Sequence, residues 1–241
     1  MSLSYFYIEQ CDPTQKEIEL DEDTSYHIVQ VLRMKPEEKL KLTDGKGNLL
    51  EGGILECHKK HCSIKIEKAS YHQPATRKVS IGISLIKNSS RFEWFLEKAT
   101  EIGVTEIIPL ICERTIREKF RYDRMKGICI SAMLQSQQTW LPILHEPIAY
   151  DLLFRQEEVA GIAQKFIAHC IEEEKHNLTS LINKSLTSQI ILIGPEGDFS
   201  KKEIDLAFEN HFIPVSLGDT RLRTETAGVV AATLLRLADY P

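Results

Sequence analysis

QIILIGPEGDFSKKE, residues 189–203, joins an apolar run directly to a turn that contains two glycines and two acidic residues. The run QIILI has the length and composition of a buried strand. Gly194 and Gly197 follow this run. Ser200 and Glu203 then form the S-x-x-E pattern of a capping box, which predicts a helix that starts at Ser200. Open parallel sheets bind ligands at the carboxyl ends of their strands. The stretch therefore predicts an α/β domain with a ligand-binding loop between this strand and this helix.

A second loop of the same kind, SLGDTRLRTETAG, spans residues 216–228. It follows the predicted strand 213–217 and precedes a closing helix expected from about Thr224 to Ala238, with Thr224 as N-cap. Arg221 and Arg223 lie beside the positive end of that helix, where a cation is unfavourable unless an anionic partner offsets it. Neither loop is a P-loop or a G-x-G-x-x-G loop, which argues against kinase and dinucleotide-binding functions.

Strands and helices alternate from Val79 onward, which is typical of a mostly parallel sheet with helices on both faces. A helix preceded by Ser90 is expected to end at Gly103, which is a typical C-cap. The other predicted elements are strands at 79–87, 105–111 and 165–170 and a basic helix at about 121–138.

The first 70 residues have a different pattern, in which short alternating runs are separated by turns such as Asp44-Gly45. One helix is expected at 24–34, with Thr24 or Ser25 as N-cap. These features predict a small β-barrel with one helix. The polar stretch YHQPATRK, residues 71–78, is a plausible linker, and we expect domains at 1–72 and 73–241.

Composition excludes several classes of protein. The chain has 241 residues, of which 42% are hydrophobic and 27% charged, as in ordinary globular proteins. No apolar stretch is long enough for a membrane helix and the N-terminus has no secretory signal, so a cytoplasmic protein is expected. The six cysteines are scattered, and CHKKHC (57–62) lacks a second ligand pair at zinc-finger spacing, so we expect a hairpin with a basic tip and no metal.

Charge distribution is more informative than the net charge of −5. A basic window from Arg114 to Lys126 includes Arg117 and Arg121, and it could hold phosphates of a nucleic acid. The alternative is a solvated helix face.

Taken together, IGPEGDFSKKE and SLGDTRLRTETAG resemble the corresponding loops of the SPOUT-superfamily 16S rRNA uridine-N3 methyltransferases, the ribosomal small-subunit methyltransferase E family. HIVQVLRM (27–34) and LEKATEIGVTEIIP (96–109) match two further motifs of that family, so the resemblance covers nearly the whole chain. Three segments depart from the common pattern: LQSQQ (134–138) lacks a Glu and an Arg, Asp219-Thr220 replaces Pro-Arg, and the N-terminal segment lacks the arginines that many relatives have before the barrel.

The resemblance implies a fold, a cofactor and partners. The fold would be an N-terminal PUA-like β-barrel followed by an α/β domain with a deep trefoil knot, which composition and periodicity could not have indicated because knots are rare. The cofactor would be S-adenosylmethionine, and the enzyme would be a homodimer acting on 16S rRNA of the small ribosomal subunit. Another SPOUT methyltransferase, acting on a tRNA base or a ribose 2′-hydroxyl, and a non-catalytic RNA-binding assembly factor are the alternatives.

Uridine N3 must lose a proton before it can attack the methyl group, so the site must take up that proton or stabilise the resulting anion. Arg223 is the candidate for stabilisation, and Glu196 and Glu225 are candidates for proton acceptor or for holding the loops. His27 and Arg33 on the barrel are candidate RNA contacts, together with Arg114, Arg117 and Arg121. The predicted cofactor-binding residues are Leu192, Ile193, Gly194, Pro195, Glu196, Gly197, Leu217, Gly218, Leu222, Thr224, Thr226 and Ala227.

Overall fold

The computed structural model describes residues 3–116, 119–170 and 175–237. The chain forms two compact units. The first comprises residues up to Pro74 together with Met133–Leu141, and the second comprises Ala75–Ala132 and Pro142 onward. The sequence pattern did not predict that Met133–Leu141 would pack with the first unit.

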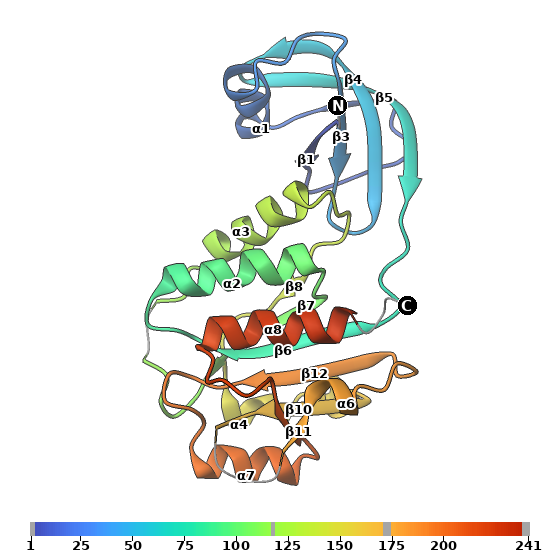
Figure 1. The fold of residues 1–241 in the computed structure, drawn as a ribbon. Coiled ribbons are helices and arrows are strands. Elements are labelled where there is room, and N and C mark those ends of the chain that lie inside the picture. The colour runs from blue at the N-terminus through green and yellow to red at the C-terminus, as the bar shows by residue number, and fades with distance from the viewer. Residues whose placement is uncertain (1–2, 117–118, 171–174, 238–241) are drawn as a thin grey trace. The chain divides into compact units, whose positions relative to one another are not determined.

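The first unit contains a five-stranded sheet of order β1-β3-β4-β5-β2, in which β1 runs parallel to β3 and the other neighbours are antiparallel (Figure 1). Phe6, Leu42 and Ile64 are among the apolar side chains that form its core. The predicted turn at Asp44-Gly45 and the predicted CHKKHC hairpin are both confirmed. The strands are β1 Ser4–Tyr7, β2 Glu17–Glu19, β3 Lys39–Thr43, β4 Asn48–His58 and β5 His61–Tyr71.

The helix of this unit starts earlier than its sequence suggested. It consists of α1 (Glu22–Tyr26), followed by a π-helical turn, η1 (His27–Val31). Its N-cap is Asp21, whose side chain accepts a hydrogen bond from the Thr24 backbone N–H at 2.8 Å, so the predicted N-cap at Thr24 or Ser25 is wrong. Ser25 is instead buried, and its hydroxyl accepts a hydrogen bond from the Cys62 N–H at 2.9 Å, which attaches the helix to the sheet.

Met133–Leu141 returns to the first unit and packs on the turn before β4. The Trp140 indole N–H donates to the His72 carbonyl oxygen at 3.0 Å, and the Gly47 N–H donates to the Thr139 carbonyl oxygen at 2.8 Å. Gly47 has φ +93°, and a Cβ there would come within 2.6 Å of the His72 oxygen. Only glycine fits this position.

The second unit contains a parallel sheet of order β11-β13-β10-β12-β6-β7-β8, with β9 paired to β7. Its strands are β6 Lys78–Ser84, β7 Glu106–Ile111, β8 Ile143–Leu144, β9 Ile148–Ala149, β10 Gln164–Ala168, β11 His176–Asn177, β12 Ser188–Ile193 and β13 Ile213–Ser216. The predicted α/β architecture and the predicted strands are confirmed.

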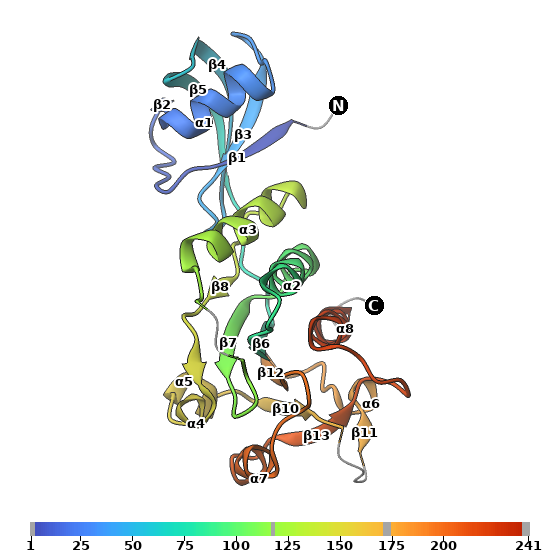
Figure 2. The same cartoon turned by 90° about the vertical axis from the view of Figure 1, so that its left-hand side faces the viewer.

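Helices cover both faces of this sheet. α2 and α8 lie together on one face, and α4, α5 and α7 lie on the other (Figures 1 and 2). The helices that follow β6 in the chain are α2 Ser89–Ile102, α3 Tyr122–Gln135, α4 Tyr150–Leu153, α5 Glu157–Ala160, α6 Leu178–Leu181, α7 Lys201–Glu209 and α8 Thr224–Leu237. None of the described helices is long and apolar enough to cross a bilayer.

Two helix ends of the second unit test the predicted caps. Gly103 ends α2 with φ +88°, as predicted. The N-cap of α2 is Asn88, whose side chain accepts from the Ser90 N–H at 3.0 Å, so the helix begins one residue before Ser90. The capping box is present, since the Glu203 carboxylate accepts from the Ser200 N–H at 2.8 Å at the start of α7.

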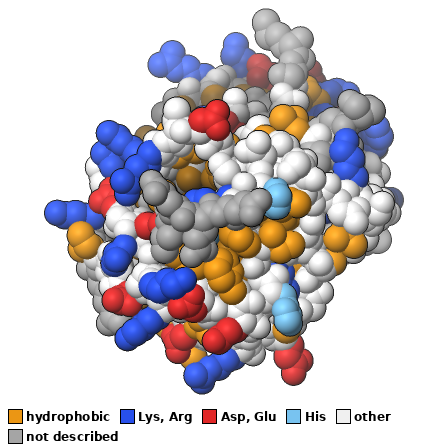
Figure 3. Space-filling view, turned by 60° about the horizontal axis from the view of Figure 1, so that its bottom comes forward, with side chains coloured by type: hydrophobic (Ala, Val, Ile, Leu, Met, Phe, Trp, Pro, Cys, Tyr) orange, Lys and Arg blue, Asp and Glu red, His pale blue; other side chains and the backbone are white. Residues whose placement is uncertain are grey.

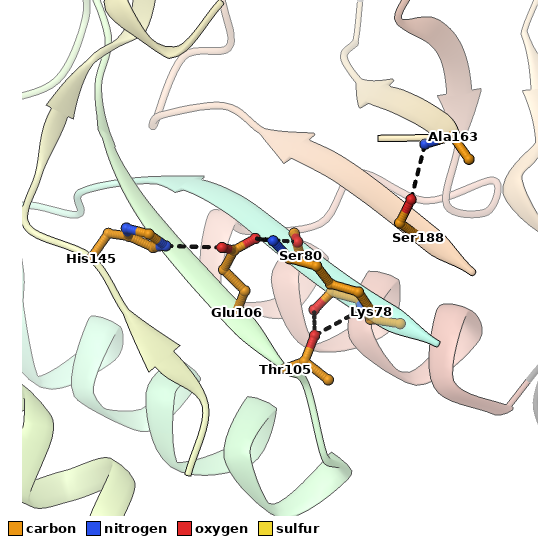
Figure 4. Close-up of polar contacts among 8 residues, drawn as sticks. Lys78, Ser80, Thr105, Glu106, His145, Ala163 and Ser188 are labelled. Atoms are coloured by element: carbon orange, nitrogen blue, oxygen red, sulfur yellow. Dashed lines mark hydrogen bonds and ion pairs between the residues drawn. The ribbon is translucent and has the colours of Figure 1, made fainter. Parts of the chain in front are cut away.

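A buried polar cluster lies at the amino-terminal ends of β6 and β7 (Figure 4). The Glu106 carboxylate is 3.0 Å from Lys78 Nζ and 3.0 Å from His145 Nε2, and it accepts a hydrogen bond from the Ser80 hydroxyl. Burial by itself would raise the pKa of Glu106, but hydrogen bonds from His145, Ser80 and Lys78 outweigh it and lower that pKa to about 2. The ionised form of Glu106 is therefore stabilised by folding.

This cluster predicts how stability depends on pH. Because the pKa of Glu106 falls from 4.5 to about 2 on folding, its contribution is complete above pH 4.5 and is lost as the pH drops toward 2. Glu106→Gln should lower the free energy of unfolding at pH 7 by about 2–3 kcal/mol, and the difference from wild type should shrink between pH 5 and pH 2. Denaturant unfolding across this pH range measures it. Glu97→Gln, in an exposed ion pair with Lys98, is the control and should have little effect; an equal effect of both variants would contradict the prediction.

Candidate functional site

A cavity of about 740 Å³ lies where the loops after β12 and β13 meet the end of β10 and the start of α2. All three strands are parallel and end at the same edge of the sheet, with β10 between the other two. The loops that follow β12 and β13 therefore flank the residues that follow β10. This is the edge at which parallel α/β sheets bind ligands.

The first loop makes a tight turn from β12 into α7. The Asp198 N–H donates to the Pro195 carbonyl oxygen at 3.0 Å, and both Gly197 (φ +93°) and Asp198 (φ +74°) have left-handed backbone conformations. A Cβ on Gly194 would come within 3.0 Å of the Phe199 ring. Close packing against Phe199 thus favours glycine at 194, and the backbone conformation favours glycine at 197.

Two contacts fix this loop to its surroundings. The Asp198 carboxylate accepts from the Cys170 N–H at 2.7 Å, which ties the loop to the end of β10. The Arg114 guanidinium donates to the Gly197 carbonyl oxygen and lies 3.5 Å from that of Asp198. Arg114, predicted as an RNA contact, therefore also supports the loop.

The second loop is joined to the first by a buried hydrogen bond. The Thr224 hydroxyl donates to the Gly194 carbonyl oxygen at 3.0 Å. Thr224 is the first residue of α8, and the Arg223 carbonyl oxygen accepts the helical bond from the Ala227 N–H at 2.8 Å, so Thr224 is not the N-cap that its sequence suggested. Gly218 has φ +130°, and a Cβ there would meet nothing within 4 Å. A Cβ at this position would thus lie in open space, and Gly218 itself lines the cavity.

A basic residue that the sequence did not single out, Arg91, lies at the start of α2 and lines the cavity. Its Nη1 is 3.3 Å from a Glu196 carboxylate oxygen and its Nε is 3.7 Å from a Glu225 carboxylate oxygen. The Glu196 side chain is 53% exposed, whereas that of Glu225 is 8% exposed. Arg91 thus links α2, the first loop and α8.

Most of the predicted cofactor residues line this cavity. Ten of the twelve do so; Leu192 is instead buried in the core, and Thr226 does not reach the lining. Of the predicted catalytic residues, Arg223 and Glu196 line the cavity and have exposed side chains, while Glu225 is buried behind Arg91. These placements agree with a ligand site at the two loops.

The predicted RNA contacts lie on several elements. His27 is exposed in η1, and Arg33, with φ +55°, is exposed just after it. Arg114 and Arg121 are exposed on the second unit. Arg117 lies outside the described residues.

Several lining residues were missed from the sequence. Ala168 ends β10, and His169 and Cys170 follow it; a signal existed for all three, because they end a strand that the sequence predicted. Arg91 and Lys175 also line the cavity. Within the described residues, no group of three His, Cys, Asp or Glu side chains could hold a metal ion.

The cavity suits a small molecule that has both apolar and charged parts. Its volume is in the range of small-molecule sites, and it combines exposed backbone at Gly197 and Gly218 with apolar side chains such as Leu217 and Leu222. Charged residues of both signs complete it. On the face shown in Figure 3, basic and acidic side chains likewise gather beside an apolar patch.

Known proteins share both the sequence and the fold. A family model described as an RNA methyltransferase domain matches residues 73–236, and one described as an RNA methyltransferase PUA domain matches 20–67. The ribosomal RNA small subunit methyltransferase E of Synechocystis sp. is 32% identical over 213 residues, covering 86% of this chain and 68% of that relative. The chain belongs to the ribosomal RNA small subunit methyltransferase E family.

Solved structures of similar proteins agree with this family. A probable rRNA-methyltransferase from Porphyromonas gingivalis is 33% identical with a TM-score of 0.88, and the match covers 98% of both chains. A ribosomal RNA small subunit methyltransferase E from Neisseria gonorrhoeae bound to S-adenosyl methionine is 27% identical with a TM-score of 0.84, and the match covers 96% of this chain and 95% of that chain. The resemblance seen in the sequence is therefore confirmed.

In this family fold, the role of the first loop can be tested at Gly197. A valine there would be strained at φ +93°, and within 4 Å its Cβ would meet only the Arg114 side chain, at 3.8 Å, so the substitution adds a side chain on the open side of the loop. Gly197→Val should reduce the affinity for S-adenosylhomocysteine by more than about 30-fold, or roughly 2 kcal/mol, in calorimetry.

Gly103→Val is the matched control for this variant, because Gly103 has a similar φ of +88° but caps α2 away from the cavity. It should cost stability and leave the affinity unchanged. Unchanged affinity in Gly197→Val would remove the first loop from the site.

Proposed function

We propose that this protein transfers the methyl group of S-adenosylmethionine to N3 of a uridine in 16S rRNA of the small ribosomal subunit. The observation that carries the proposal is the cavity between the two loops, with Arg223 exposed at its edge, in a chain of this family. When bound there, the cofactor supplies a methyl group on a sulfonium. The protein's own residues must position the uridine and handle its N3 proton.

Arg223 is suited to the uracil anion. Its exposed guanidinium, at the N-terminal end of α8, offers several N–H donors in a fixed plane, which can stabilise negative charge on O2 or O4 as N3 loses its proton. Of the two predicted proton acceptors, Glu196 lines the cavity, whereas Glu225 is buried and does not.

RNA contacts are proposed on both units. The first unit, which includes the predicted domain 1–72, presents His27 and Arg33, and the second presents Arg114 and Arg121. Cationic side chains at these positions can hold phosphates, which position an RNA without reading its sequence. A cytoplasmic location follows from this substrate, and the trefoil knot of the second unit remains an expectation from the family resemblance.

We also propose a homodimer. α8 packs on the sheet with Gly228, Ala231 and Leu235, yet its other face carries Val230 and Leu234, which are partly exposed, and Leu237, which is 56% exposed. An apolar helix face next to the cavity favours burial against a second copy of the chain.

Light scattering at micromolar concentration should give twice 27.6 kDa. Leu234→Glu should shift the mass toward the monomer, and a wild-type monomer would contradict the proposal.

The enzymatic proposal is tested directly with purified protein, S-adenosylmethionine and small ribosomal subunits that lack the modification. Mass spectrometry of the digested rRNA should find one new N3-methyluridine. Methylation of tRNA or of a ribose hydroxyl would instead assign the protein to another SPOUT activity, and cofactor binding without methyl transfer to any RNA would indicate an assembly factor.

Substitutions of Arg223 distinguish a role in catalysis from a role in cofactor binding. Arg223→Ala should lower the methylation rate by about 10²–10³, because one preorganised charge contact is lost, while S-adenosylhomocysteine affinity should change by less than about tenfold. Arg223→Lys should recover little, since an ammonium cannot make two parallel hydrogen bonds. Arg221→Ala, at the neighbouring exposed arginine, is the control. If Arg223→Ala lowers affinity, thermal stability and rate together, its role is to hold the loop; a near-normal rate would exclude the catalytic role.

A further inference from the structure

Arg91 is shared between two carboxylates that belong to different elements. It donates from Nη1 to Glu196 at 3.3 Å, in the first loop, and its Nε lies 3.7 Å from Glu225, in the first turn of α8. The second distance is an ion-pair distance but exceeds that of a hydrogen bond. Among the described residues, no other cation lies within ion-pair distance of either carboxylate.

The arrangement leaves Glu225 incompletely paired. Its residue is 6% exposed, and its Oε2 is buried without a hydrogen-bond partner in the described chain. A buried carboxylate oxygen without a donor is costly, and the positive end of α8 offsets only part of that cost. One guanidinium for two carboxylates therefore leaves Glu225 in need of a donor.

The two carboxylates differ in exposure and in the elements that hold them. Glu196 is 53% exposed and lines the cavity, whereas Glu225 is fixed in the first turn of a packed helix. A guanidinium can donate two parallel hydrogen bonds to one carboxylate. If Arg91 moved entirely to Glu225, it would supply the missing donor, and Glu196 would lose its own.

Glu196 would then be open to solvent and to a donor on a ligand in the cavity. The sulfonium of S-adenosylmethionine carries charge but no N–H, whereas the ammonium of its amino-acid end carries charge and three N–H donors. A carboxylate that gives up a guanidinium is best matched by the ammonium.

We propose that Glu196 binds the ammonium group of the cofactor's amino-acid end, and that Arg91 is a positioning residue that moves to Glu225 as this contact forms. The inference rests on the proposed cofactor. It also assigns Glu196 to binding, so that the N3 proton passes to solvent water and stabilisation of the uracil anion by Arg223 becomes the principal means of activating N3.

The test compares two ligands that differ in the amino-acid end. S-adenosylhomocysteine has the ammonium, and 5′-methylthioadenosine lacks the whole amino acid. Glu196→Gln keeps the shape of the side chain and removes its charge, so calorimetry should show about tenfold or greater loss of S-adenosylhomocysteine affinity, and less than about twofold change for 5′-methylthioadenosine. Glu97→Gln, on the outward side of α2, should change neither affinity. Equal losses for both ligands would mean that Glu196 only shapes the loop, and no loss for either would remove it from the site; both overturn the proposal.

A second variant tests the movement of Arg91. In Glu225→Gln the attraction of Arg91 to α8 is reduced, so Arg91 should remain paired with Glu196. The affinity for S-adenosylhomocysteine should then fall by about threefold or more, and that for 5′-methylthioadenosine should not. The double variant Glu196→Gln/Glu225→Gln should then bind no more weakly than Glu196→Gln alone. Additive losses would refute the movement of Arg91, and thermal stability measured alongside identifies a folding defect. A wild-type protein that binds neither ligand would refute the proposed cofactor itself, whereas binding of both without selective loss would refute only this inference.

Discussion

The cavity depends on one buried hydrogen bond, from the Thr224 hydroxyl to the Gly194 carbonyl oxygen. The two loops leave strands that are not neighbours, since β10 lies between β12 and β13. Arg91 also joins the two loops, through Glu196 and Glu225, but at longer distances of 3.3 and 3.7 Å. The hydrogen bond makes the start of α8 and the end of β12 one structural element, so Arg223 and the first loop keep a fixed relation. Such fixed placement is what a methyl transfer requires, because the nucleophile must lie in line with the methyl group.

The sequence specified the local parts of this site well. Both loops, the capping box at Ser200 and the C-cap at Gly103 follow from short-range rules about glycine, proline and side-chain oxygens. Helix starts were less predictable, because Asp21 and Asn88 compete with nearby serines and threonines of similar capping strength. Thr224 illustrates the same limit: its hydroxyl bonds to Gly194, thirty residues earlier in the chain, and no local rule could indicate that.

Long-range order was beyond the sequence pattern. Nothing in the runs 164–168, 188–193 and 213–216 states that the first lies between the other two, so the strand that ends at Ala168, His169 and Cys170 was predicted, but its place between the two loops was not. Arg91 was missed for a related reason, since its partners lie on two elements more than a hundred residues away. The return of Met133–Leu141 to the first unit depends on the fit of Trp140 against Gly47 and His72, which is a property of the folded surface.

The two ends of the parallel sheet differ in how completely their buried carboxylates are paired. At the amino-terminal ends of β6 and β7, Glu106 is buried among three donors, and its charge is fully compensated. At the carboxyl ends, Glu225 is buried with one shared guanidinium and an oxygen that has no donor. A fully paired group stabilises the fold, and a change of partners would give it no additional hydrogen bond. An underpaired group makes the ligand-free site less stable than it could be, and a ligand that allows the pairing to be completed recovers that energy on binding. The two ends of the same sheet thus differ in pairing, and only at the carboxyl end, in the proposed site, would a bound cofactor allow the pairing of a buried carboxylate to be completed.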